Sequence, residues 1–60
     1  MNKLLIKQCQ DSLLWYADKI GQTVPLEGIW PDGYKSREDG GSVNIVRFAD
    51  AEVITINDKD

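Results

Sequence analysis

Few side chains in this sequence can do acid–base or nucleophilic chemistry. There is no histidine, the residue that most often transfers protons near neutral pH, and one cysteine, Cys9. The carboxylates include two close pairs, Glu38 with Asp39 and Asp50 with Glu52. Each pair lies in a predicted turn or capping corner, where acidic side chains commonly accept hydrogen bonds from nearby backbone N–H groups. We therefore expect a protein that is not an enzyme.

Binding sites for a cofactor or a metal are also not indicated. Gly40 and Gly41 are not followed by the Lys-Ser/Thr pair and the helix that a phosphate-binding loop requires. A metal would have only oxygen ligands and one thiol, at no recognisable spacing. Cys9 has no partner for an internal disulfide and no histidine or basic cluster to activate its thiol, so we interpret it as a small buried apolar residue. We expect no cofactor and no metal.

The aromatic residues are the stronger candidates for a functional surface. Trp15 and Tyr16 share a long segment with the acidic Asp18, whereas Trp30 and Tyr34 flank a Pro-Asp-Gly turn signal. These five residues are the predicted contacts with a protein partner. The opposing interpretation is that a thin core needs two or three of the four rings, and it is favoured for Trp30 and Tyr16. Trp15 is then the expected exposed anchor.

Basic residues offer a second type of surface. Lys35, Arg37 and Arg47 fall on predicted neighbouring strands with Tyr34 nearby, as nucleic-acid binding by cations and stacking rings requires. However, the chain has ten acidic and seven basic residues and a net charge of −3, and acids are interleaved with these three cations. A solvated face of mixed sign is the favoured interpretation, and nucleic acid is not the expected partner.

The length of 60 residues predicts a single domain over 1–60, ordered over about 3–56 and ending in a polar tail at 57–60. A chain this short buries only about 60% of the surface that its unfolded form exposes, so its core must be thin. The apolar run near the start, Leu4 to Ile6, is too short for a signal peptide or a membrane span. We expect a cytoplasmic protein without a membrane partner, present as a monomer or a weak dimer.

The amino-terminal third permits two structures. Read with period two, Leu4 and Ile6 share one face, which predicts a strand over 3–9 followed by a long loop over 10–21 that holds a helical turn. Read with period 3.6, the apolar residues form one stripe of a helix over 3–20, packed on an antiparallel sheet. Asp11 and Ser12 favour the strand, because such residues prefer caps and turns to helix interiors.

The remainder reads as short strands separated by turns. A strand is predicted over 22–30, at a sheet edge or bulged because Pro25 cannot donate a hydrogen bond. Turns follow at 31–33 and 38–41, the first including a positive φ, with a short polar strand over 34–38 between them. The alternation slips within the strand over 43–48, which predicts a bulge or burial on both faces. A helical turn is predicted at 50–52, before a last strand over 53–56.

Five short strands in this length indicate a mainly β fold, a small barrel or rolled sheet. The segments IGQTVPL (20–26), GGSVNIVRF (40–48) and DAEVI (50–54) resemble the short SH3-like barrel proteins of phage, prophage and bacterial genomes. The resemblance spans most of residues 3–56 and implies a five-stranded barrel with a long first loop.

The predicted function is a small protein-interaction module or inhibitor, with its contact surface around Asp11 to Lys19 and with Trp30 and Tyr34 adjacent. SH3-like modules that bind proline-rich peptides have Pro and Tyr at the last turn, where this chain has Ala-Asp-Ala-Glu. The alternative is a nucleic-acid-binding module like the KOW-type SH3-like domains. A third possibility is sheet-edge pairing at the strand that contains Pro25.

Overall fold

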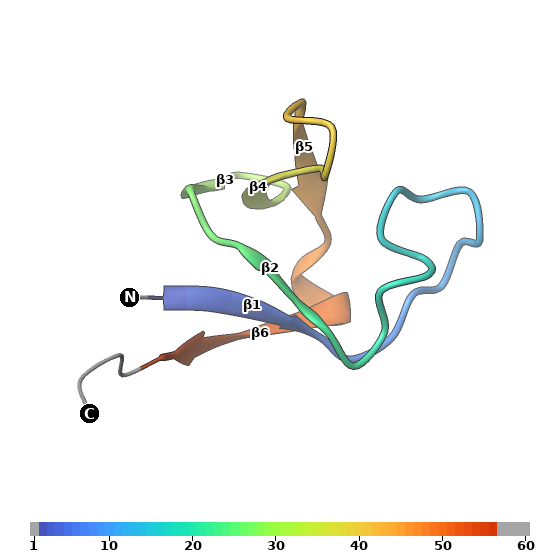
Figure 1. Ribbon diagram of the computed structural model, residues 1–60, viewed down its shortest axis with the longest axis horizontal. Coiled ribbons are helices and arrows are strands. Elements are labelled where there is room, and N and C mark those ends of the chain that lie inside the picture. Colours follow the sequence, from blue (N-terminus) through green and yellow to red (C-terminus); the bar gives the residue numbers. More distant parts are fainter. Residues whose placement is uncertain (1, 57–60) are drawn as a thin grey trace.

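The protein folds into two small antiparallel sheets and a long loop that extends to one side of them (Figure 1). The computed structural model describes residues 2–56. The elements in this part of the chain are β1 (Asn2–Ile6), β2 (Thr23–Pro25), β3 (Gly28–Trp30), β4 (Gly33–Arg37), β5 (Val43–Val46), the 3-10 turn η1 (Phe48–Asp50) and β6 (Ala51–Thr55). The first sheet has the order β2-β1-β6 and the second the order β3-β4-β5.

The mainly β class is confirmed, and the alternative of a helix over 3–20 is wrong. Residues 2–6 form β1, which pairs with both β2 and β6. Leu4 and Ile6 are fully buried, as the period-two pattern predicts. The apolar residues that recur with helical period do not share one buried face, because Leu13 and Ile20 among them are exposed.

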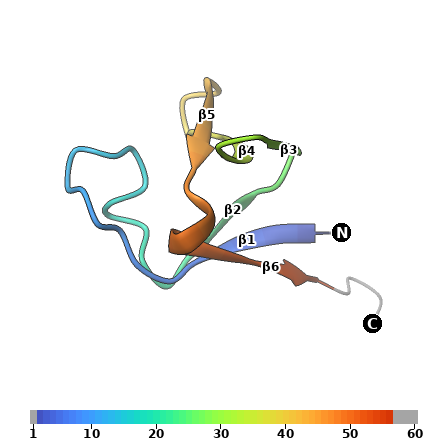
Figure 2. The same ribbon diagram turned by 180° about the vertical axis from the view of Figure 1, so that it is seen from behind.

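The described residues form two three-stranded sheets and no closed barrel, in contrast to the five-stranded barrel that was predicted. The strand expected over 22–30 is divided into β2 and β3, because Pro25 has no N–H and the chain leaves the ladder at residues 26–27. Figure 2 shows the second junction, where η1 turns the chain from β5 in one sheet to β6 in the other. The first sheet therefore has β2 as an edge strand, as Pro25 indicates.

The core lies between the two sheets and is as thin as the length implies. Its buried apolar members come from both sheets, η1's exit and the long loop: Leu4, Ile6, Tyr16, Val24, Val46 and Ala51. Cys9 is a half-buried free thiol packed against this cluster. With so few members, each side chain represents a large share of the buried apolar area, which contributes about 25 cal/mol per Å².

Gly33 is required by a close approach between strands rather than by its backbone dihedral. The turn lies at 31–32, and β4 begins at Gly33, one residue before the predicted strand. The positive φ predicted for this turn is wrong, because Gly21 and Gly41 are the residues with positive φ in the described part of the chain. A Cβ built on Gly33 would lie 2.6 Å from the carbonyl oxygen of Val46 and 2.8 Å from Cγ1 of Ile45. Strand β5 therefore packs directly on the backbone of β4.

The slipped alternation in the fifth strand has a simple origin. β5 keeps an uninterrupted register with β4 over Val43–Val46, so there is no bulge within it. Val46 faces the core, while Ile45 is half-buried against Gly33 on the opposite face. The chain then leaves the sheet, and the helical turn falls at Phe48–Asp50, two residues before its predicted place.

Candidate functional site

The long loop between β1 and β2 is a series of tight turns. Three successive backbone hydrogen bonds run from the N–H groups of Leu14, Ala17 and Lys19 to carbonyl oxygens three residues earlier, at 3.0–3.1 Å. Asp11 begins the series, since its Oδ1 accepts a hydrogen bond from the N–H of Leu13 (2.9 Å), as its predicted capping role requires. Gly21 ends it with a φ of 86°. The loop thus has an internal structure that can place its side chains.

Three side chains of this loop reach across to the second sheet and the turns beside it. The indole Nε1–H of Trp15 donates to the carbonyl oxygen of Ile45 in β5 (2.8 Å). The hydroxyl of Tyr16 donates to Oδ2 of Asp50 (2.6 Å). We call these two hydrogen bonds, together with the ion pair between Lys19 and Asp39, the loop ties.

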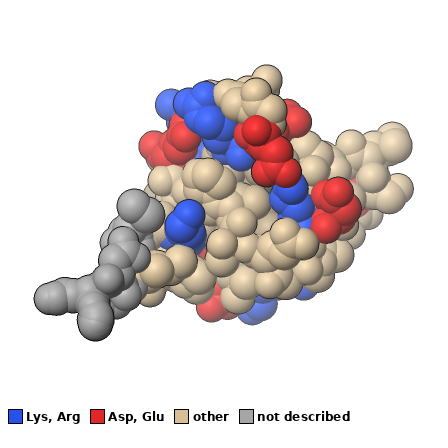
Figure 3. Space-filling view, in the orientation of Figure 1, with Lys and Arg blue, Asp and Glu red and all other residues tan. Residues whose placement is uncertain are grey.

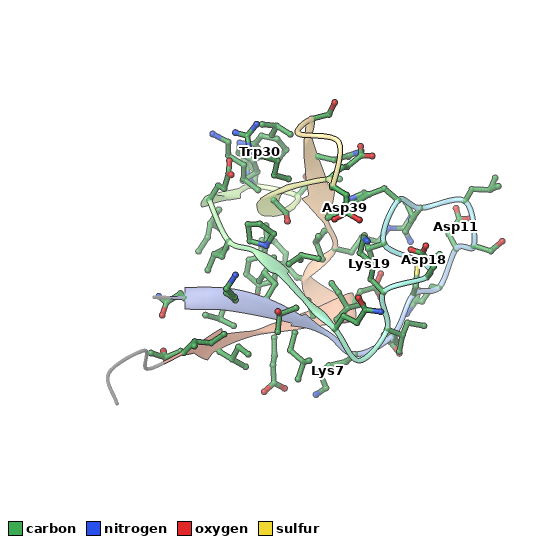
Figure 4. The ribbon with its side chains drawn as sticks, in the orientation of Figure 1. Lys7, Asp11, Asp18, Lys19, Trp30 and Asp39 are labelled. Atoms are coloured by element: carbon green, nitrogen blue, oxygen red, sulfur yellow. The ribbon has the colours of Figure 1, made fainter. Side chains whose placement is uncertain are left out.

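The third tie joins Lys19 to Asp39 in the turn between β4 and β5. Its Nζ lies 2.7 Å from Oδ2, and this hydrogen bond raises the pKa of the lysine. Figure 4 shows the two labelled residues pointing toward each other from the loop and the turn. The aspartate is largely exposed, so the pair contributes little to stability. The ion pair instead joins the long loop to the turn between β4 and β5.

Tyr16 and Asp50 form a buried polar pair. Both side chains are inaccessible to solvent, and the tyrosine oxygen also accepts a hydrogen bond from the N–H of Arg47 (3.2 Å). Oδ1 of Asp50 is buried and has no hydrogen-bond partner among the described residues. Burial, reinforced by the hydrogen bond to Asp50, raises the pKa of Tyr16 to about 12. Among the described residues, the Tyr16 hydroxyl is therefore the hydrogen-bond donor to the buried side chain of Asp50.

This pair predicts a loss of stability at alkaline pH. The folded protein holds the Tyr16 proton to a pKa of about 12, whereas an unfolded tyrosine titrates near 10. The contribution is therefore complete below pH 10 and disappears as pH rises to 12, by roughly 2–3 kcal/mol. Urea unfolding measured at several pH values from neutral to 12 checks this. Tyr16→Phe should lack this step.

The structure does not place the predicted contact residues on one surface. Tyr16 belongs to the core, which the core interpretation favoured. Trp15 is half-buried and hydrogen-bonded, so the prediction that it is the exposed anchor is wrong. Trp30 is 38% exposed rather than a core residue. Asp18 is exposed, but Figure 4 shows it on the opposite side of the molecule from Trp30.

A different set of apolar side chains lies together at the edge of the core, with two of them exposed on either side of the half-buried Tyr34. Ile29 of β3 lies directly opposite Tyr34 of β4 in the ladder, so the two side chains are neighbours on one face. The ring of Tyr34 makes an edge-to-face contact with Phe48 of η1, with ring centroids 4.9 Å apart. Ile29 is 68% exposed and Phe48 is 44% exposed. We call these three residues the Ile29–Tyr34–Phe48 patch.

The sequence singled out Tyr34 in this patch but missed the other two residues. Ile29 lies in the predicted strand over 22–30, and Phe48 was assigned to the end of the predicted strand over 43–48. The available signal was the excess of apolar residues in the 43–48 segment over the positions that one face could bury. Placing Phe48 beside Tyr34 depends on η1, whose position the sequence predicted two residues too late.

One of the three basic residues proposed for nucleic acid, Arg37, is engaged with another part of the protein. Nε and Nη2 of Arg37 donate to the two carboxylate oxygens of Glu27 at 2.7 and 2.9 Å, and Nη1 donates to the carbonyl oxygen of Gly41. The hydrogen bond from Arg37 lowers the pKa of Glu27. Lys35 is half-buried, and Arg47 is exposed. Figure 3 shows the cations interspersed with acids on the visible face, without an uninterrupted basic area.

Within residues 2–56 there is no group of three or more metal-ligating His, Cys, Asp or Glu side chains. No helix in that range is long and apolar enough to cross a membrane. Comparison with family models, curated proteins and solved structures found no match for this chain.

Proposed function

We propose that this chain is a small, non-enzymatic protein-interaction module that binds a partner through the Ile29–Tyr34–Phe48 patch. The observation that carries the proposal is the exposure of Ile29 and Phe48 on either side of Tyr34. A 60-residue domain has little apolar area with which to stabilise itself. Leaving the large apolar side chains of Ile29 and Phe48 exposed beside the half-buried Tyr34 costs stability, and exposed apolar patches mark interaction sites.

An SH3-like architecture is part of the same proposal, and the element order supports it. A long first loop separates β1 from β2, the second strand is broken into two segments that belong to different sheets, and a 3-10 turn precedes the last strand. The last strand then returns to pair with β1. In SH3-like modules that bind peptides, aromatic residues from the loops and strand ends line the contact surface.

Nucleic-acid binding remains the second candidate function, with Lys35, Arg37 and Arg47 as its residues. The bidentate ion pair between Arg37 and Glu27 makes it the weaker of the two. A phosphate would have to displace a carboxylate that already satisfies the planar guanidinium. Retention on heparin at low salt, lost in Lys35→Ala, would favour this candidate over the patch.

Phe48→Ser tests the patch because it removes the exposed ring and changes no hydrogen-bonded side chain. We expect the immobilised wild-type protein to retain a specific partner, and Phe48→Ser to retain at least about tenfold less of it, as loss of a central interface anchor implies. Quantitative mass spectrometry of the retained proteins measures this.

Val43→Ser is the matched control, because Val43 is 40% exposed on β5 and lies outside the patch. It should retain the partner as the wild type does. Equal retention by Phe48→Ser and the wild type would contradict the assignment of the patch.

A further inference from the structure

Open sheet edges are a second feature that can form interactions, and most of them are blocked here. The edge of β5 is covered by side chains. The N–H of Ile45 donates to Oδ1 of Asn44, its carbonyl accepts from the Trp15 indole, and the N–H of Arg47 donates to the Tyr16 hydroxyl. The long loop and the Asn44 side chain therefore occupy the outward groups of Ile45 and the N–H of Arg47, which a further strand would need on this side.

The edges of β2 and β3 are poor sites for strand pairing. In β2, Pro25 has no N–H, and its carbonyl oxygen accepts a hydrogen bond from Oγ of Ser36 (2.7 Å). In β3, Trp30 pairs with Gly33 across the two-residue turn, so the central Ile29 alone directs its backbone away from β4. The pairing at the Pro25 strand that the sequence suggested therefore has no open groups at Pro25.

The edge of β6 is different, and the hydrogen bonds of β1 show why. The N–H of Ile6 donates to the carbonyl of Gln22 on the β2 side (3.0 Å). The N–H of the next residue, Lys7, donates to the carbonyl of Asp50 on the β6 side (2.8 Å). Successive residues of a strand direct their backbone groups to opposite edges. Lys3 and Leu5 therefore face β6 as Lys7 does.

In β6, Ile54 pairs with Lys3 and Glu52 pairs with Leu5, so these two residues direct their backbone groups toward β1. The residues of β6 that alternate with them direct their N–H and C=O groups away from β1. These outward residues are Ala51, Val53 and Thr55. Figures 1 and 2 show no segment of the described chain beside the second half of β6 on that side. β6 contains no proline and no lysine, the residues that commonly protect an open edge.

We propose that β6 pairs antiparallel with β6 of a second copy of this chain, around a two-fold axis at Val53. The outward groups of an unprotected strand fit another extended strand, and this register is self-complementary. Val53 faces Val53 of the second copy, and Ala51 faces Thr55. Glu52 faces Ile54 rather than the second Glu52, so no like charges lie directly opposite each other. Pairing also covers Val53, which is 43% exposed.

The dimer is weak and depends on salt. A five-residue strand buries less than the roughly 800 Å² per partner of a stable interface. Each copy has a net charge of −3, so the two copies repel, and added salt screens that repulsion. The expected behaviour is a monomer at low protein concentration and a dimer at high concentration, with the transition moving to lower concentration as salt increases.

Sedimentation equilibrium of the full chain over a wide range of concentrations tests the proposal. We expect Val53→Lys to remain monomeric at every concentration at which the wild type dimerises, because a lysine opposite its own copy adds repulsion at the two-fold axis. Val43→Lys is the matched control, since Val43 has similar exposure on a strand whose edge is capped, and it should dimerise as the wild type does.

Thr55→Pro provides a second variant in case Val53→Lys is poorly folded by circular dichroism. It removes an outward N–H and leaves the backbone groups that face β1, although it also removes the Thr55 hydroxyl that donates to Oδ1 of Asn2, and it should also weaken the dimer. Phe48→Ser should not affect dimerisation, which separates this proposal from the proposed function. A wild type that stays monomeric at all concentrations and salts, or equal weakening by Val43→Lys and Val53→Lys, would overturn it.

Discussion

Tyr16→Phe is expected to lower the free energy of unfolding by about 3 kcal/mol, the upper end of the cost of leaving a buried hydrogen-bonding group without its partner. The substitution keeps the buried ring and removes only the hydroxyl. Oδ2 of Asp50 then loses its 2.6 Å hydrogen bond, and Oδ1 already has no partner among the described residues. The N–H of Arg47 also loses its acceptor. A domain of this size has only about 3–5 kcal/mol of stability, so a large unfolded population should be visible without denaturant.

The second tyrosine provides the control. Tyr34 is half-buried, and its hydroxyl makes no hydrogen bond with another described residue. Tyr34→Phe should therefore change the urea midpoint very little. If both substitutions shift the midpoint by the same small amount, the buried pair does not stabilise the fold.

Gly33→Ala is expected to be as damaging, for a steric reason. The added Cβ would lie 2.6 Å from the carbonyl oxygen of Val46, which is backbone and cannot rotate away. β5 would have to move away from β4, and with it Val46 in the core and Ile45, the acceptor of the Trp15 tie. We expect a loss of about 3 kcal/mol, at the upper end of the usual cost of overpacking a core.

Gly40→Ala is the matched control for this prediction. A Cβ at Gly40 meets no atom within 4 Å, and its φ is not positive. Its free energy of unfolding should be equal to or slightly above that of the wild type, because alanine reduces the entropy of the unfolded chain. Thermal unfolding followed by circular dichroism measures both variants. Similar melting temperatures for the two would show that β4 and β5 can separate without cost.

The sequence predicts local features well where a residue has one strong preference. The alternation of Leu4 and Ile6 identifies β1, and Pro25 correctly predicts an edge strand, although the single strand expected over 22–30 is divided after it. The turn at 31–32 and the turn that ends at Gly41 follow from glycine and its neighbours. Each of these predictions depends on backbone chemistry within a few residues.

Features that depend on distant contacts could not be predicted in this way. Trp15 is expected at the surface because its neighbour Tyr16 takes the inward position, yet its indole finds an acceptor thirty residues away in Ile45. Asp50 looks like a surface capping residue, and only the position of η1 over the loop buries it against Tyr16. The loop aromatic residues were predicted as partner contacts for the same reason, because the sequence does not show that Trp15 and Tyr16 bond to Ile45 and Asp50.

In this proposal the aromatic residues of the long loop hold the fold together, and the binding surface is the Ile29–Tyr34–Phe48 patch on the second sheet and η1. A double-mutant cycle between Tyr16→Phe and Asp50→Ala tests it most directly by urea unfolding. We predict a coupling free energy of about 2 kcal/mol, as for a buried hydrogen bond to a charged group. A coupling indistinguishable from zero would contradict the claim, since the tyrosine and the carboxylate would then not hold the loop to η1.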